Sequence, residues 1–289
     1  MLLERNEVNP EKADKWSITP LCGAVVYGRG GVVRMLLERG GVNPNTAGTV
    51  FGQTVFLWAA EHGHEEIVRI LLERNDINPN QADDWGQTAL LWAAKNGHEG
   101  IVRTLLELDD LNPDIADICG RTPLLWAAKY GHEGTVRMLL GRDDVNLKKF
   151  DKWRKTALYQ AVAYGHEGIV RVLLERGSAN PNTTDTGLGQ TLFLRAIQSG
   201  HEGIVRILLQ RKYINLDQAD EWGQTPLICA AKGGHEGIVR ILLERNDVDP
   251  DEANKWGRTP LLQAAANGHK GITGVLLEGN DVCPDGANN

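Results

Sequence analysis

The chain has 289 residues, 42% of them hydrophobic, and a formal net charge of −7 from 31 Lys and Arg against 38 Asp and Glu. This composition supports a folded core, and the acidic balance disfavours binding to the phosphates of nucleic acid. No apolar run is long enough to span a membrane and the charged start is no secretory signal, so we expect no membrane contact and an intracellular protein, in the cytoplasm or alternatively the nucleus.

The chain opens inside a repeating unit. Its first residues, Met-Leu-Leu-Glu-Arg-Asn, match the sequence Met-Leu-Leu-Glu-Arg at 35–39, which ends a predicted helix. We therefore expect residues 1–13 to be the remnant of a preceding repeat. The chain is then a segment of a longer array or a truncated product, and other domains of a longer parent protein are among its expected partners.

From residue 14 onward a unit of 34 or 35 residues repeats. A Gly-His doublet marks each copy at residues 63, 97, 131, 165, 200, 234 and 268, and Gly28-Arg29 is a variant first copy. A fixed period of this size indicates one supersecondary unit that is stacked along a solenoid, and such stacks usually bind other molecules. The predicted repeats are residues 14–48, 49–82, 83–116, 117–150, 151–185, 186–219, 220–253 and 254–289.

Each copy predicts two short helices, as the repeat at residues 83–116 illustrates. Thr88 can cap the first helix, and the next position is Pro in four copies, which suits the first residue of a helix. Gly97 is placed to end that helix. In the second helix one apolar face is formed by Ile101, Val102, Leu105 and Leu106. An Asn-Pro pair then stops the helix.

This pattern closely resembles the ankyrin repeat. The resemblance rests on segments such as Thr-Pro-Leu-Leu-Trp-Ala-Ala at 122–128 and Asp-Val-Asp at 247–249, and it covers residues 14 to 289. The chain departs from the motif at its first His, which is replaced by Cys22, Leu57, Leu91, Leu125, Tyr159, Leu194, Ile228 and Leu262. Copies this alike resemble the long ankyrin arrays of fungal multidomain proteins. The resemblance implies an all-α solenoid of eight helix pairs with short β-hairpin fingers.

A second level of repetition has an offset of 137 residues, as in the matching segments 27–46 and 164–183. A block of four repeats was therefore duplicated, and differences between the blocks are informative. Residues 1–145 hold 14 Lys and Arg against 21 Asp and Glu, whereas residues 146–289 hold 17 of each. The acidic balance of the first half predicts mild electrostatic steering of a basic partner toward that half. The alternative is that the charge serves only to keep the protein soluble.

Neither the His nor the Cys residues predict chemistry. Each recurring His lies in its own repeat, so we expect it to form hydrogen bonds in the turn between helices and not to bind metal. The four Cys residues lie at different places in separate repeats, which indicates neither disulfides nor a zinc site. With no nucleophile elbow or phosphate loop, the sequence predicts no catalytic residues, no cofactor and no metal.

Two groups of positive charges are candidate contacts for nucleic acid or another anion. An Arg recurs in the second helices, at residues such as 103, but Glu residues four positions before and after it neutralise the column. One segment is more basic, and its residues are a candidate anion contact or a solvated loop: Lys148, Lys149, Lys152, Arg154 and Lys155.

Aromatic residues form two sets. The first set lies three residues before the capping Thr, at the tips that the resemblance turns into a row of fingers: Trp16, Phe51, Trp85, Trp153, Trp222 and Trp256. Stacking between neighbouring fingers is the alternative to binding for these residues. The second set, Trp58, Trp92 and Trp126, lies four residues after the Thr.

The second set belongs to a candidate binding surface. On a helix these Trp residues share one stripe with positions three and four further on. We call this surface the first-helix stripe: Trp58, His62, Trp92, Lys95, Asn96, Trp126, Lys129 and Tyr130. The ankyrin resemblance implies that it lines a concave groove. The alternative is that the indoles pack between neighbouring helices, since aromatic stripes are more often core.

We expect a protein-interaction module that binds a protein or peptide in the groove and at the finger tips. A spacer or sensor segment of a larger receptor, without a ligand of its own, is the alternative. An enzyme is a remote third class, because no catalytic constellation is visible.

Overall fold

The computed structural model describes residues 9–46, 52–176, 191–211 and 219–278. The chain divides into two compact units, residues 1–152 and 153–289, each of which is described by itself. The division falls at the start of the fifth predicted repeat, so the units correspond to the two duplicated blocks. Phe51, Cys283 and the first eight residues of the predicted remnant lie outside the described residues.

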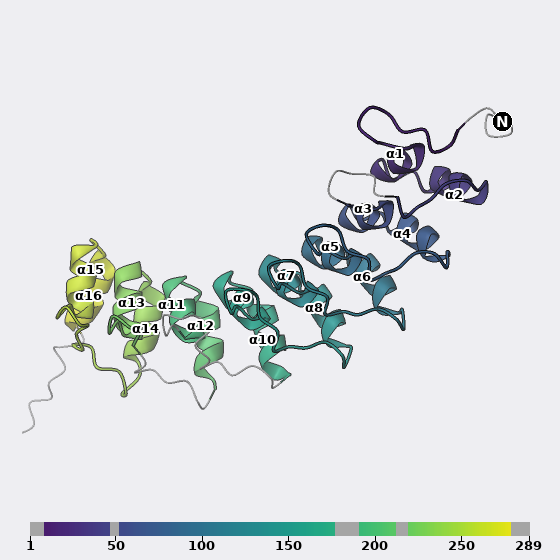
Figure 1. Ribbon diagram of the computed structural model, residues 1–289. Helices are drawn as coiled ribbons and strands as arrows, with labels where there is room; N and C mark the ends of the chain where they lie inside the picture. The colour runs from purple at the N-terminus through teal and green to yellow at the C-terminus, as the bar shows by residue number, and fades with distance from the viewer. Residues whose placement is uncertain (1–8, 47–51, 177–190, 212–218, 279–289) are drawn as a thin grey trace, which may run out of the picture. The chain divides into compact units, whose positions relative to one another are not determined.

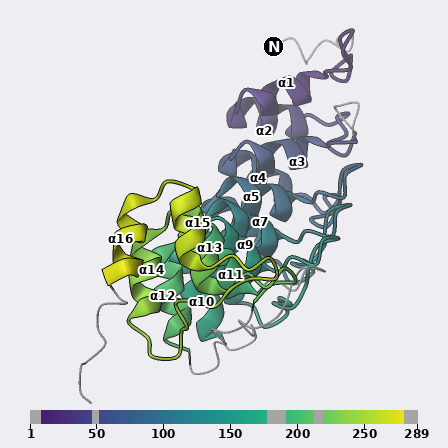
Figure 2. The same ribbon diagram turned by 90° about the vertical axis from the view of Figure 1, so that its left-hand side faces the viewer.

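The first unit consists of helix pairs (Figure 1). Its first helices are α1 (Pro20–Val26), α3 (Val55–Glu61), α5 (Ala89–Asn96) and α7 (Pro123–Tyr130). Its second helices are α2 (Gly30–Glu38), α4 (Glu65–Leu72), α6 (Glu99–Leu106) and α8 (Glu133–Leu140). Figure 2 shows that the described loops between successive pairs of this unit extend to the same side of its helices.

The second unit repeats this arrangement. Its first helices are α9 (Ala157–Ala163), α11 (Leu192–Gln198), α13 (Pro226–Gly233) and α15 (Pro260–Ala266). Its second helices are α10 (Glu167–Glu175), α12 (Glu202–Leu209), α14 (Glu236–Leu243) and α16 (Lys270–Glu278). One helix pair lies within each of the eight repeat ranges that the sequence predicts.

The helix ends follow the predicted signals. Thr88 has an extended backbone, and its hydroxyl accepts a hydrogen bond from the Leu91 amide, which satisfies one of the otherwise unpaired donors of the first turn. The equivalent Thr caps every first helix. Gly97 ends α5 with a φ of 74°, in the left-handed region that favours glycine. The predicted Thr caps are confirmed, and the predicted Gly stop is confirmed for α5, α7 and α13.

Helices pack in two rows within each unit. Each first helix contacts the first helix of the next pair, and each second helix contacts the next second helix. Ala93 and Ala127, on α5 and α7, have no exposed surface. Leu105 on α6 is also fully buried, whereas its neighbour Leu106 is only half-buried, so the predicted apolar face is narrower than the sequence indicated.

The expected β-hairpins are not seen in the described residues. In the described residues, the loop before α5 contains only an isolated antiparallel bridge between Ala82 and Thr88. A side chain adds to the backbone hydrogen bonds of this loop, because Asp83 Oδ1 accepts from the amides of Trp85 at 3.0 Å and Gln87 at 2.8 Å. Neighbouring tips are joined by the Ile118 amide, which donates to the Trp85 carbonyl at 2.9 Å.

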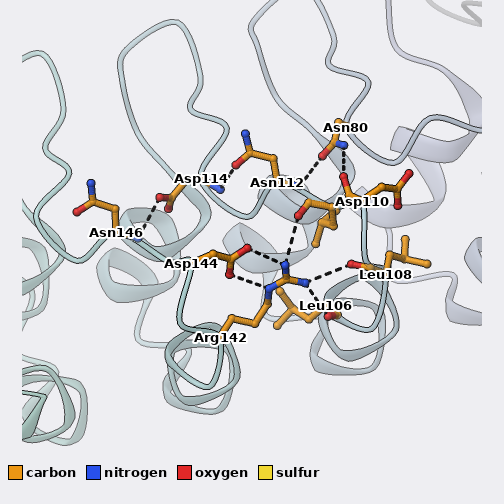
Figure 3. A network of polar contacts seen from close by, with 10 residues as sticks. Asn80, Leu106, Leu108, Asp110, Asn112, Asp114, Arg142, Asp144 and Asn146 are labelled. Atoms are coloured by element: carbon orange, nitrogen blue, oxygen red, sulfur yellow. Dashed lines mark hydrogen bonds and ion pairs between the residues drawn. The ribbon is translucent and has the colours of Figure 1, made fainter.

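Polar side chains also join the loops that follow the second helices (Figure 3). Asn80 Oδ1 accepts from the Asn112 amide at 2.8 Å, and Asp114 Oδ2 accepts from the Asn146 amide at 2.9 Å. Arg142 Nη1 donates to the Leu106 carbonyl at 2.9 Å. Each bond crosses from one repeat to the next, so these loops are held by neighbours and not by their own sequence alone.

Candidate functional site

Two tryptophans of the first-helix stripe are buried. Trp92 is 9% exposed and Trp126 is 5% exposed. Their Nε1 atoms donate to Asp83 Oδ2 and Asp117 Oδ2, each at 3.2 Å. The prediction that these indoles are exposed is therefore wrong, and the packing alternative describes them. Helical spacing correctly predicts which side chains lie beside an indole on its own helix. The residues that cover the indole come from other helices and loops, which spacing does not predict.

Asp117 is the centre of this arrangement. Its Oδ1 accepts from the amides of Cys119 at 2.8 Å and Arg121 at 2.9 Å, and its Oδ2 accepts from Arg121 Nε at 2.8 Å. Its side chain is 1% exposed, so the charge is buried but well paired. One carboxylate therefore holds the loop, the indole of Trp126 and a guanidinium together.

Positive groups cover the buried indoles. Lys95 Nζ lies 4.3 Å from the ring centroid of Trp92 and 5.0 Å from that of Trp126. Arg121 Cζ is 4.1 Å from the Trp126 centroid, and Lys129 Nζ is 5.0 Å from it. These are distances at which a cation is attracted to the face of an aromatic ring. Tyr130 stacks on Trp126 with a centroid distance of 5.5 Å and remains 47% exposed.

Burial lowers the pKa of the Lys95 ammonium below its ordinary value. The positive charges of Arg121 and Lys129 act in the same direction, whereas the carboxylates of Glu61 and Asp117 oppose the shift. Lys95 therefore lies close to two other positive charges, those of Arg121 and Lys129. Its own charge is less well solvated than that of a surface lysine.

The rest of the stripe is built differently. Trp58 is half-buried, and its Nε1 has no hydrogen-bond partner among the described residues. His62 stacks on it at 4.6 Å and 15°, and His62 Nδ1 lies 3.0 Å from the Trp58 carbonyl oxygen. Asn96 Nδ2 donates to the Glu61 carbonyl at 2.9 Å, so part of this side chain serves to join repeats.

The second unit has no tryptophan in this column. The corresponding side chains are Gln160, Arg195, Cys229 and Gln263. Burial raises the pKa of the Cys229 thiol to about 11, which makes it a poor nucleophile at neutral pH. Asp220 Oδ2, the counterpart of the atoms that bind the indoles, is buried without a partner among the described residues.

The described finger tips differ in exposure. Trp16, Trp153 and Trp256 are more than half exposed, Trp85 is 39% exposed and Trp222 is half-buried. Lys15 Nζ lies 4.2 Å above the Trp16 ring. The tips therefore present large apolar surfaces to solvent.

Two lysines of the basic segment each contact a residue of their own unit. Lys149 Nζ donates to the Asp114 carbonyl at 2.8 Å, and Lys155 Nζ lies 5.4 Å from the Tyr159 ring centroid. Lys148, Lys152 and Arg154 are exposed. Lys149 thus has a structural role that the sequence did not reveal.

Five of the recurring His residues hydrogen-bond to the preceding repeat, whereas Nε2 of His64 is buried without a partner among the described residues. His132 Nε2 lies 3.0 Å from the Lys95 carbonyl oxygen, and His98 Nε2 lies 2.9 Å from that of Glu61. The expected hydrogen bonding is found, but it crosses to the preceding repeat and is not confined to the turn. In the described ranges no group of three His, Cys, Asp or Glu residues is placed to hold a metal ion.

Replacing His132 with Ala is expected to lower the free energy of unfolding by about 1 kcal/mol, the net value of one such hydrogen bond. Denaturant unfolding followed by circular dichroism measures this loss. Arg69→Ala, which removes an exposed ion pair with Glu65, is the control and should change stability by less than about 0.5 kcal/mol. Stoichiometric zinc or iron in the purified protein would instead reopen the metal hypothesis.

Spacing alone did not identify several residues of the site, namely Arg121 and the carboxylates of Asp83 and Asp117. A signal was present, because Asp or Asn stands five residues before the capping Thr in six copies. Only the folded loop shows why, since the two oxygens of one side chain bind the loop backbone and the next helix's indole.

On the second helices the predicted pairing of the Arg column is confirmed for several copies. Arg137 Nη2 lies 2.7 Å from Glu133 Oε1, four residues earlier, and Arg240 forms the same pair with Glu236 at 2.8 Å.

None of the helices in the described part of the chain has the length and apolar character required to cross a membrane.

Comparison with known proteins identifies the repeat. The family model described as "Ankyrin repeats (3 copies)" matches in seven overlapping segments, residues 1–83, 22–117, 75–151, 110–185, 144–220, 178–251 and 193–285. A search of the curated proteins gave no match. The matched segments cover almost the whole chain, and the fold is an all-α repeat solenoid without strands in its described residues. The chain belongs to the ankyrin repeat family.

Proposed function

We propose that the chain recognises a protein or peptide through the exposed part of the first-helix stripe, with the finger tips as a second contact region. Ankyrin repeats are generally protein–protein interaction modules, which supports the class of function. One observation carries the choice of surface: Lys95, Lys129 and Tyr130 lie against the buried indoles of Trp92 and Trp126. Side chains that are ordered before binding lose less entropy when a partner arrives.

In this proposal the tryptophans support the surface and do not form its contacts. Tyr130, His62 and the lysines meet the partner, while Trp58 adds a half-exposed ring at one end. The exposed indoles of Trp16 and Trp85, at the tips of the same unit, offer large and rigid apolar contacts.

Selection of peptides from a displayed library, followed by binding measurements on variants, tests the proposal. Tyr130→Ala is expected to weaken a selected peptide by about 2 kcal/mol, as the loss of an interface aromatic does. The matched control is Arg137→Ala, on the exposed second-helix face, which should leave affinity unchanged. Peptides that respond to Arg137→Ala and not to Tyr130→Ala would contradict the choice of surface. A library that yields no specific peptide would favour the spacer alternative.

A further inference from the structure

Three cations of the first unit lie against three aromatic rings. The group consists of Trp92, Lys95, Arg121, Trp126, Lys129 and Tyr130, and we call it the cation–aromatic cluster. Its cation-to-ring distances run from 4.1 Å for Arg121 over Trp126 to 5.4 Å for Lys129 over Tyr130. Lys95 reaches two rings from neighbouring repeats, so the cluster joins α5 and α7.

We propose that the cation–aromatic cluster binds the carboxylates of an acidic peptide segment of a partner protein. The inference rests on the proposed function, because it names the chemistry of the partner that the stripe recognises. The argument is charge complementarity, because the positive groups of Lys95, Arg121 and Lys129 all lie against the ring of Trp126. Hydrogen bonds from a Lys or Arg side chain to a carboxylate are charge-assisted and are among the stronger polar contacts.

Two carboxylates of the protein that act on Lys95 already have other hydrogen-bond partners. Asp117 is buried and already accepts from two amides, an indole and Arg121 Nε. Glu61 accepts a hydrogen bond from Gln53 Nε2 on its own repeat. Arg121 uses Nε for Asp117, and a guanidinium has further donors on its two terminal nitrogens. A ligand carboxylate can therefore approach Arg121 without displacing an internal partner.

The local charge of the cluster differs from that of its surroundings. The first 145 residues hold 14 Lys and Arg against 21 Asp and Glu, so an extended polyanion such as nucleic acid is repelled by much of this half. A short acidic segment interacts only with the charges near the cluster, because screening limits interactions to about 8 Å at physiological salt; these charges are the three cations and the neighbouring carboxylates of Glu61 and Asp117. This favours an acidic peptide over nucleic acid as the ligand.

The second unit provides an internal comparison. Lys232 on α13 occupies the position that corresponds to Lys95, but Cys229 stands where Lys95 has Trp92 beneath it. The position that corresponds to Arg121 is Arg258, but Gln263 and Ala266 stand where the first unit has Trp126 and Lys129. Lys232 is exposed and has neither the two indoles nor the second lysine of the first unit. It is a matched control for the charge alone.

Fluorescence anisotropy with a labelled peptide in which Glu alternates with Ser tests the inference. We expect binding that weakens as salt is raised, and a matched peptide with Gln in place of Glu should bind at least tenfold more weakly, at about the scale of one lost charge pair. Lys95→Gln and Lys129→Gln should each weaken the Glu peptide about tenfold, whereas Lys232→Gln should leave it unchanged. Melting curves of the variants verify that each is folded.

Other results would overturn the inference. These are equal binding of the Glu and Gln peptides, no binding of the Glu peptide at low salt, equal effects of Lys95→Gln and Lys232→Gln, or tighter binding of a single-stranded oligonucleotide than of the Glu peptide. Library peptides that lose affinity with Tyr130→Ala but contain no acidic residues would reject the acidic partner and leave the proposed function intact. Library peptides that ignore the stripe would reject the proposed function instead.

Discussion

Replacing Leu105 with Ala is expected to lower the free energy of unfolding by about 2–5 kcal/mol, the cost of a large-to-small change in a packed core. Leu105 lies on α6 with no exposed surface, and α6 packs against α4 and α8. A repeat buries its apolar face only against its neighbours, so the cavity removes contacts on which adjacent repeats depend. Urea unfolding followed by circular dichroism and by Trp fluorescence measures the change.

Leu106 is the matched control for this prediction, because it is the next residue of the same helix and is only half-buried. Leu106→Ala should cost clearly less than Leu105→Ala, since it removes less buried surface. Equal losses in the free energy of unfolding would contradict the difference in burial between Leu105 and Leu106. Repeat arrays can unfold in parts, so agreement between the two probes should be checked first.

Replacing Trp92 with Gln is expected to cost about 3–5 kcal/mol, as for other changes that remove a buried Trp side chain. The change removes the indole under Lys95 and leaves Asp83 Oδ2 without its donor. Thermal and urea unfolding measure the loss. Gln stands at the same position in the last repeat, as Gln263, but its neighbouring first helix carries Cys229 and not a second indole.

Two further variants separate packing from hydrogen bonding. Trp92→Phe keeps a ring but removes the donor, and should cost about 1–3 kcal/mol because a buried carboxylate oxygen is left unpaired. Trp58→Phe should cost less, because Trp58 Nε1 has no partner among the described residues and the ring is partly exposed. If Trp92→Gln left stability unchanged while abolishing peptide binding, the indole would be a direct contact and not a support.

Together these effects divide the site into a buried and an exposed layer. Trp92 and Trp126 belong to the core by burial, and their aspartate partners fix their orientation. Lys95, Lys129 and Tyr130 lie on that layer and meet solvent. Changes in the first layer should therefore alter stability and binding together, and changes in the second should alter binding with little effect on stability.

Local signals in the sequence determined the repeat and its helices. The 34- or 35-residue period, the capping Thr and the terminal Gly each act within a few residues, so Thr88 and Gly97 bound α5 as predicted. The apolar spacing of the second helices likewise placed Ile101 and Val102 in the core. These features depend on the geometry of one helix, which spacing describes well.

Tertiary contacts decided the character of the candidate site. Helical spacing placed Trp126 on a stripe away from the buried Leu residues, but Lys95 of the preceding repeat, together with Arg121 and Asp117 of the loop before α7, covers it. The His bonds similarly reach back one repeat, 37 residues from His132 to Lys95. Burial of a side chain depends on what neighbouring repeats bring to it, and this information lies a full period away from the residue itself.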